Sequence, residues 1–154
     1  MSIAEHFNKE AFDFIPRTFV LPQDYNQFKN YLTISGKNAV FIAKPAQGSQ
    51  GDDIRLFRDL RELGSKKYQD TVVQKYINNP FLVNGLKFDF RFYIILTGIY
   101  EDKVHAFLAN EAIVRFCTEK YEKAEPSNFK NIFMHLTNYS INKLSKKYKN
   151  DLQV

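Results

Sequence analysis

The stretch at residues 86–98, "LKFDFRFYIILTG", is the clearest β-strand signal in the sequence. At its start, phenylalanines at every second position alternate with Asp89, Arg91 and Tyr93. Side chains two residues apart in a strand point to the same side of the sheet. The stretch therefore predicts a strand with one aromatic face and one face that carries a carboxylate and a guanidinium.

The residues that follow predict further strands joined by short turns. The sequence "YEDK" at residues 100–103 is expected to turn into a strand at 104–109, and "NEA" at 110–112 into a strand at 113–118. These elements together predict an antiparallel meander. A polar loop at 119–131 and an apolar segment at 132–141 follow.

The N-terminal half predicts extended segments and one clear helix. Residues 23–32 place aromatic and apolar side chains at helical spacing, which predicts an amphipathic helix. Residues 55–70 are expected to be helical or mixed, with Gly64 as a helix stop. Extended segments are expected at residues 14–22, 39–44 and 71–77. Asn84-Gly85 is expected to form a turn. The predicted class is α+β, with strands dominating the middle of the chain.

Composition narrows the classes of function. The chain has 154 residues, an aromatic share of 16% that argues against disorder, and a net charge of +5 that favours an acidic partner. It lacks a secretory signal pattern and any apolar run long enough to span a membrane. It also lacks an RNA-binding aromatic motif or a zinc pattern. We expect a cytoplasmic protein with neither a membrane nor a nucleic-acid partner.

Residues 41–54, "FIAKPAQGSQGDDI", pass from an apolar strand into a loop of small and polar residues. Gly48 and Gly51 would let backbone amides approach an anion, and Lys44 could reach a phosphate as a point charge. The Lys-Ser or Lys-Thr pair of a P-loop is missing. These residues alone fit a surface turn with a solvated lysine as well as a phosphate-binding loop.

Charged side chains within the predicted strands permit two interpretations. Asp89 with Arg91 could form a cross-strand ion pair on a solvated face, or the wall of a site where a guanidinium grips a carboxylate or phosphate. Arg115 lies between apolar residues of its own predicted strand. His135 and the single cysteine, Cys117, are each expected to be buried and structural.

Six segments in order give the sequence a family resemblance: "FIPRTFVLP", "FIAKPAQGSQG", "VVQKYI", "GLKFDFRFYI", "AIVRFCTEKY" and "FMHLTNYSINK". This order resembles the tubulin–tyrosine ligase-like family of ATP-grasp ligases, which add amino acids to tubulin. The resemblance covers about residues 14–143 and leaves a basic tail at 144–154. It implies a single partial domain over residues 1–154, with an ATP-grasp-like, mainly antiparallel sheet, flanking helices and an incomplete fold.

The resemblance also implies roles for particular residues. Catalytic or substrate-binding roles fall on Asp89, Arg91 and Arg115. Nucleotide-binding roles fall on Lys44, Gln47, Gly48, Ser49, Gln50, Gly51, Gln74, Lys75, Tyr76, Ile77, Lys87, Asp89, Thr137 and Asn138. Of these, Gln47 to Gly51 resemble a phosphate-covering loop, and Gln74 to Ile77 resemble the backbone stretch beside the adenine.

The implied activity is the ATP-dependent addition of tyrosine, glutamate or glycine to tubulin through an acyl phosphate. ATP and Mg²⁺ would be cofactors, and a free amino acid and the acidic tails of tubulin or microtubules would be partners. The expected place of action is the cytoskeleton, including the cilium or basal body. The family's magnesium ligands are expected beyond this chain, so no metal ligand is assigned and no turnover is expected from it alone.

One departure from the family pattern keeps an alternative open. Asp52 and Asp53 follow Gly51, where the family commonly has a basic residue and a glycine. Two carboxylates beside a phosphate loop would repel ATP unless they turn outward or hold a cation. The alternative is a non-catalytic module that binds nucleotide or the acidic tubulin tails.

Overall fold

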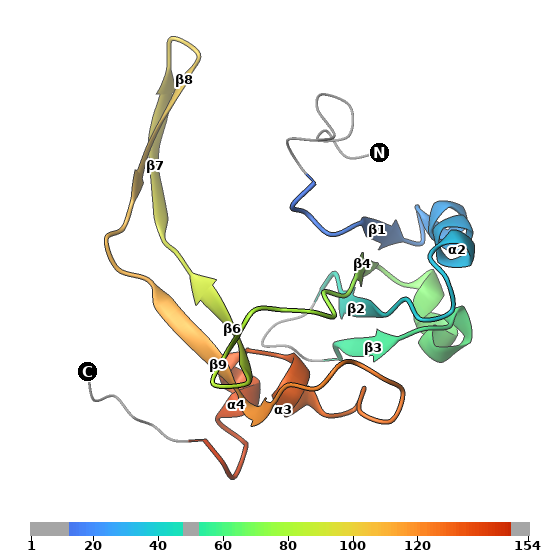
Figure 1. The fold of residues 1–154 in the computed structure, drawn as a ribbon. Coiled ribbons are helices and arrows are strands. Elements are labelled where there is room, and N and C mark those ends of the chain that lie inside the picture. The colour runs from blue at the N-terminus through green and yellow to red at the C-terminus, as the bar shows by residue number, and fades with distance from the viewer. Residues whose placement is uncertain (1–12, 48–52, 149–154) are drawn as a thin grey trace. The chain divides into compact units, whose positions relative to one another are not determined.

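The computed structural model describes residues 13–47 and 53–148 (Figure 1). The chain divides into two compact units. The first contains Met1–Pro80 and Lys123–Lys130, and the second contains Phe81–Glu122 and Asn131–Val154. The chain therefore leaves the first unit, returns to it for one short segment, and leaves it again.

The first unit is built on a four-stranded sheet in the order β1-β4-β2-β3. Its strands are β1 (Thr18–Leu21), β2 (Phe41–Pro45), β3 (Arg55–Phe57) and β4 (Thr71–Lys75). All three pairings are antiparallel. Strands at 39–44 and 71–77 were predicted correctly, and β1 falls within the extended segment predicted at 14–22.

The core of this unit lies between the sheet and helix α2 (Tyr25–Ile34). Phe28 of α2 is 0% exposed, and its ring lies 5.2 Å from that of Phe19 and 5.2 Å from that of Phe41. Tyr31 of the same helix also packs against the buried residues. These residues lie at the helical spacing read from the sequence, so the predicted amphipathic helix is confirmed.

The segment predicted as helical or mixed contains both kinds of structure. It begins with strand β3 and continues as the 3₁₀ helix η2 (Leu60–Tyr68). Gly64 interrupts η2 with φ 56° and ψ −132°, a conformation that glycine adopts without steric cost. The predicted helix stop at Gly64 is confirmed.

The second unit contains a three-stranded antiparallel sheet in the order β5-β6-β9. Its strands are β5 (Leu82–Val83), β6 (Leu86–Arg91) and β9 (Ile113–Lys120). Asn84 and Gly85 join β5 to β6 with φ values of 51° and 73°. Two positive φ angles are what a two-residue hairpin turn requires, so this turn prediction is confirmed.

The predicted meander is wrong. The strand expected over residues 86–98 stops at Arg91, and β7 (Ile94–Tyr100) begins after Phe92 and Tyr93. β7 pairs with β8 (Lys103–Leu108) as a separate hairpin, whereas β6 pairs with β9. Alternation predicts which face a residue takes but not which strand becomes the partner, because pairing depends on distant side chains.

Two short helices, α3 (Ile132–His135) and α4 (Tyr139–Asn142), pack against β9, and α3 also contacts β6. The covered sheet face includes Cys117, which is 1% exposed. Burial raises the pKa of the Cys117 thiol to about 11, which keeps it protonated. Cys117 is buried, as expected for a structural thiol. The opposite face carries Phe88 and Phe90, whose rings lie 5.3 Å apart.

The hairpin β7–β8 exposes apolar side chains on both of its faces. Ile94, Ile95 and Phe107 are 69%, 62% and 64% exposed. No helix in the described ranges has the length and apolar character needed to cross a membrane.

Phe28→Ala is expected to lower the free energy of unfolding by about 3–5 kcal/mol, because it leaves a cavity among buried aromatic rings. Urea denaturation followed by circular dichroism measures this change. Ile34→Ala is the matched control, since Ile34 lies on the same helix and is 79% exposed. Its cost should stay within about 0.5 kcal/mol. Equal losses in both variants would contradict the core described above.

Candidate functional site

Lys44 lies on β2 and is half-buried on the sheet face opposite the apolar core. Its Nζ donates a hydrogen bond of 3.0 Å to Gln74 Oε1 on the neighbouring strand β4. Burial lowers the pKa of Lys44 because it removes the ammonium from water. Among the described residues, no carboxylate forms an ion pair with this amine.

A short chain of hydrogen bonds fixes Gln74. Its Nε2 donates to Thr18 Oγ1 at 2.8 Å, and Thr18 Oγ1 donates to Pro16 O at 2.8 Å. Gln74 therefore turns its carbonyl oxygen toward Lys44. The family resemblance implied a role for the backbone at Gln74, beside the adenine. The structure also gives the Gln74 side chain a defined position beside Lys44.

The backbone after Gln74 is partly committed to other contacts. Lys75 N–H donates to Arg17 O at 2.8 Å, and Tyr76 N–H donates to Val40 O at 2.9 Å. The Tyr76 side chain is buried, while that of Ile77 is 55% exposed. An adenine edge at this stretch would have to meet backbone groups other than those two amides.

Most of the predicted phosphate-covering loop lies outside the described residues. Gln47 is described and is exposed, whereas Gly48, Ser49, Gln50, Gly51 and Asp52 are not among them. Asp53 is described, and its Oδ1 accepts a hydrogen bond of 2.7 Å from Arg55 Nη2. The ion pair offsets the charge of one of the two carboxylates that depart from the family pattern.

The second unit brings Asp89 and Arg115 together as a fork across two strands. Asp89 on β6 stands opposite Arg115 on β9 in the strand register. Arg115 Nε donates to Oδ1 at 2.7 Å, and Arg115 Nη2 donates to Oδ2 at 2.6 Å. Two parallel charge-assisted bonds fix the plane of the guanidinium against the plane of the carboxylate, whereas a single bond from a lysine would leave both side chains able to rotate. The side chains remain 27% exposed for Arg115 and 34% for Asp89.

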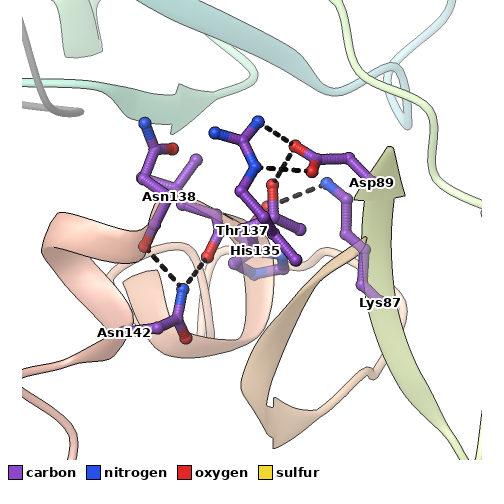
Figure 2. A network of polar contacts seen from close by, with 8 residues as sticks. Lys87, Asp89, His135, Thr137, Asn138 and Asn142 are labelled. Atoms are coloured by element: carbon purple, nitrogen blue, oxygen red, sulfur yellow. Dashed lines mark hydrogen bonds and ion pairs between the residues drawn. The ribbon is translucent and has the colours of Figure 1, made fainter. Parts of the chain in front are cut away.

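Thr137 completes this cluster, because its Oγ1 donates to Asp89 Oδ2 at 2.7 Å (Figure 2). Burial acts to raise the pKa of the Asp89 carboxyl, but the hydrogen bonds from Arg115 and Thr137 outweigh it, and the charges of Arg115 and Arg91 act in the same direction. The pKa of Asp89 is therefore lowered. The pair also raises the pKa of Arg115.

Arg91 is not the fork partner of Asp89. It lies two residues further along β6 and is exposed, and it acts on Asp89 through its charge. The sequence placed Arg91 on the same strand face as Asp89. It gave Arg115 no position relative to Asp89, since that depends on the pairing of β6 with β9.

Lys87 lies on the same strand as Asp89 and points toward helix α3. Its Nζ donates to the backbone oxygen of His135 at 2.8 Å. The His135 side chain is 1% exposed and packs edge-on against Tyr121 with ring centroids 6.0 Å apart. His135 is buried, as expected for a structural histidine.

Asn142 is a residue that the sequence argument did not single out. It is 2% exposed and lies at the end of α4. Its Nδ2 donates to the backbone oxygens of Leu136 and Asn138, which flank Thr137 (Figure 2). The signal that could have found it is a second asparagine at i+4 from Asn138.

The two clusters suit the binding of anions. Lys44 with Gln74 offers a half-buried amine, and Arg115 with Asp89 and Thr137 offers a guanidinium held rigidly in place. The described residues contain no group of three or more His, Cys, Asp or Glu side chains that could hold a metal ion.

The model of the tubulin-tyrosine ligase family matches residues 2–154. The chain belongs to this family. A probable beta-tubulin polyglutamylase of Tetrahymena thermophila is 42% identical over 141 residues, which is 91% of this chain and 12% of that relative. Human tubulin polyglutamylase TTLL7 is 42% identical over 143 residues, which is 91% of this chain and 16% of the human protein.

Mouse tubulin polyglutamylase TTLL11 is 36% identical over 156 residues, which is 96% of this chain and 21% of the mouse protein. This member of the tubulin-tyrosine ligase family therefore spans a small part of the length of the relatives it matches. The family resemblance found in the six segments is confirmed, and the predicted α+β class with antiparallel sheets agrees with the strand pairings.

Asp89→Asn is expected to lower the free energy of unfolding at pH 7 by about 1–3 kcal/mol, toward the lower end because solvent reaches the pair. The folded-state pKa of Asp89 is lowered, so this stabilisation is present above the unfolded value of about 3.9 and is lost as pH falls through the folded value. Urea unfolding of both proteins from pH 6 to pH 2.5 should show their difference shrinking.

Asp70→Asn serves as the control, because Asp70 is exposed and makes no ion pair within the described ranges. Its stability difference from the parent chain should stay small at every pH. A difference for Asp89→Asn that does not change with pH would contradict the role given to the charged fork.

Proposed function

We propose that this chain forms the nucleotide-binding and amino-acid-binding part of an ATP-dependent ligase that adds glutamate to tubulin. The observation that carries the proposal is the extent of the family match, which runs over residues 2–154 and so includes every candidate site residue. The similar proteins of Tetrahymena, human and mouse are all named as tubulin polyglutamylases or probable ones. Glutamate is therefore chosen over tyrosine and glycine.

The reaction forms an amide bond in two steps. A carboxylate oxygen of the tubulin tail bonds to the γ-phosphorus of ATP, and the bond to the β-γ bridging oxygen breaks, releasing ADP. The amine of glutamate then attacks the carbonyl carbon of the acyl phosphate, phosphate leaves, and the amine loses a proton. Positioning and charge stabilisation carry both steps, so no protein nucleophile is required.

Lys44 would hold the phosphates in this scheme. Its half-buried amine already has one neutral partner, Gln74 Oε1 at 3.0 Å, and an anion would add a charged one. The loop residues Gln47, Gly48, Ser49, Gln50 and Gly51 would cover the phosphates, and Gln74, Lys75, Tyr76 and Ile77 would border the adenine. Lys87 would make a further contact with the nucleotide.

Arg115 would hold the carboxylate of the incoming amino acid. Its Nε and Nη2 are fixed on Asp89 at 2.7 and 2.6 Å, which holds the plane of the guanidinium in place. Arg91, on the same face of β6, would add positive charge. Asn138, next to Thr137, would meet polar groups of the nucleotide or the amino acid. Mg²⁺ would offset phosphate charge when bound.

The proposed partners are free glutamate and the acidic tails of tubulin or microtubules, and the proposed place of action is the cytoskeleton, including the cilium or basal body.

A second candidate function is a module that binds nucleotide or tubulin tails without turnover. The observation that favours it is a net charge of +5 with exposed lysines at Lys143, Lys146 and Lys147. Both functions require binding of nucleotide or of tubulin tails. Only the ligase would convert ATP to ADP in the presence of glutamate and tubulin, so this conversion separates the two.

Mg-ATP at 100 times its Kd is expected to raise the melting temperature of the chain by about 5–10 °C, since binding to the folded state adds about 2.7 kcal/mol. Differential scanning fluorimetry measures the shift. Lys44→Ala should abolish it. Lys29→Ala should leave it intact, because Lys29 is an exposed residue of α2 outside the candidate site.

A shift that Lys44→Ala removes and Lys29→Ala retains would support the nucleotide role. A cooperative melt with no shift in the parent chain would contradict it. An equal shift in all three proteins would place the nucleotide away from Lys44 and would also overturn the assignment.

A further inference from the structure

We propose that Asn142 is a positioning residue for the amino-acid site, acting through Thr137 and Asp89 on Arg115. The inference rests on the proposed function, because it assigns Arg115 to the substrate carboxylate. It adds a residue that neither the sequence argument nor the family comparison assigns. The network in Figure 2 connects these residues through contacts that are each within hydrogen-bond distance.

Asn142 uses the full hydrogen-bonding capacity of its amide. Nδ2 donates to Leu136 O at 2.7 Å and to Asn138 O at 3.0 Å. Oδ1 accepts from Thr118 N–H at 2.9 Å and from Thr118 Oγ1 at 3.1 Å. With the side chain 2% exposed, water does not compete for these bonds, so the amide holds both of its neighbours in fixed positions.

The contact with Thr118 ties α4 to a particular place on β9. The pairing of β6 with β9 shifts register between Leu86 and Phe88, where Leu86 stands opposite Lys120 and Phe88 opposite Phe116. Thr118 lies within this irregular stretch of β9. Its backbone N–H donates to the Asn142 side chain, which thus acts as a partner where the regular ladder is interrupted.

The contacts with Leu136 and Asn138 fix the backbone on both sides of Thr137. Asn142 thereby sets the position of the Thr137 hydroxyl, which donates to Asp89 Oδ2 at 2.7 Å. The same Asp89 oxygen also accepts from Arg115 Nη2 at 2.6 Å. A displaced hydroxyl would remove the Thr137 hydrogen bond from Asp89, so that the Asp89 carboxylate and the Arg115 guanidinium would be able to turn together.

A purely structural role predicts a different result. If Asn142 only stabilises the packing of α4 on β9, its removal lowers the free energy of unfolding but leaves the Asp89 environment of the folded protein unchanged. The pKa of Asp89 separates the two roles, because the hydrogen bond from Thr137 lowers it. This measurement needs no substrate, so its outcome does not depend on the proposed function.

The experiment measures the pKa of Asp89 from its carboxyl carbon chemical shift in the ¹³C-labelled chain. We expect Asn142→Ala and Thr137→Val each to raise the pKa. We expect the double variant to raise it no further than Thr137→Val alone, because Asn142 acts through that hydroxyl. If Asn142→Ala does not fold, Thr118→Val replaces it in the experiment. This variant keeps the shape of the Thr118 side chain and removes one bond to Asn142, so it should raise the pKa of Asp89 by a smaller amount.

Ile141→Val is the matched control. Ile141 is the preceding residue of α4 and is 8% exposed, so this variant disturbs the same packing without touching the amide. It should leave the pKa of Asp89 unchanged. An unchanged pKa in Asn142→Ala, or equal rises in that variant and in Ile141→Val, would overturn the positioning role.

A second readout relates the role to the substrate. Calorimetric titration with free glutamate should show Asn142→Ala binding about three- to tenfold more weakly than the parent chain at a temperature where both are folded. Equal affinities would overturn the inference. A parent chain that binds no glutamate would overturn the proposed function instead, while the pKa result would still decide whether Asn142 positions Thr137.

Discussion

The bidentate pair between Asp89 and Arg115 is the interaction on which the second unit depends. It joins β6 to β9, with bonds of 2.7 and 2.6 Å. Burying two charges costs desolvation energy. Here Asp89 and Arg115 offset each other's charge, Asp89 also accepts a hydrogen bond from the Thr137 hydroxyl, and both side chains remain partly exposed to water. The segment between β9 and α4 is folded so that this hydroxyl reaches Asp89. The pair thus links β6 to β9 by opposite charges and holds the Arg115 guanidinium of the candidate site in place.

The first unit is held together by an aromatic core instead of an ion pair. Phe28 of α2 sits among the rings of Phe19, Phe41 and Phe57, which leaves the other sheet face to Lys44 and Gln74. The core therefore fixes the strands that present a half-buried amine. An anion site built from these strand residues would share the rigidity of the sheet.

The sequence predicted local features well, because their causes are local. The helical spacing of Phe28 and Tyr31, the turn at Asn84-Gly85 and the interruption at Gly64 all follow from the conformational preferences of the residues themselves. It failed on the partner of β6, since the choice between the strand at β8 and the strand at β9 depends on side chains far away in the chain. The same failure hid the true partner of Asp89, which is Arg115 rather than Arg91. Asn142 was missed because its two bonds to Thr118 exist only once α4 has packed on β9.

The most direct test of the central claim is an NMR titration of the ¹⁵N-labelled chain with glutamate in the presence of Mg-ATP. The account predicts saturable shifts of the Arg115 side-chain Nε–H signal and of the Thr137 and Asn138 amides, with Lys146 and Lys147 of the basic tail unmoved. Shifts confined to the lysines of that tail, with Arg115 and Thr137 unchanged, would contradict it. Such a result would mean that the chain attracts glutamate only by charge and does not hold it at the Asp89–Arg115 pair.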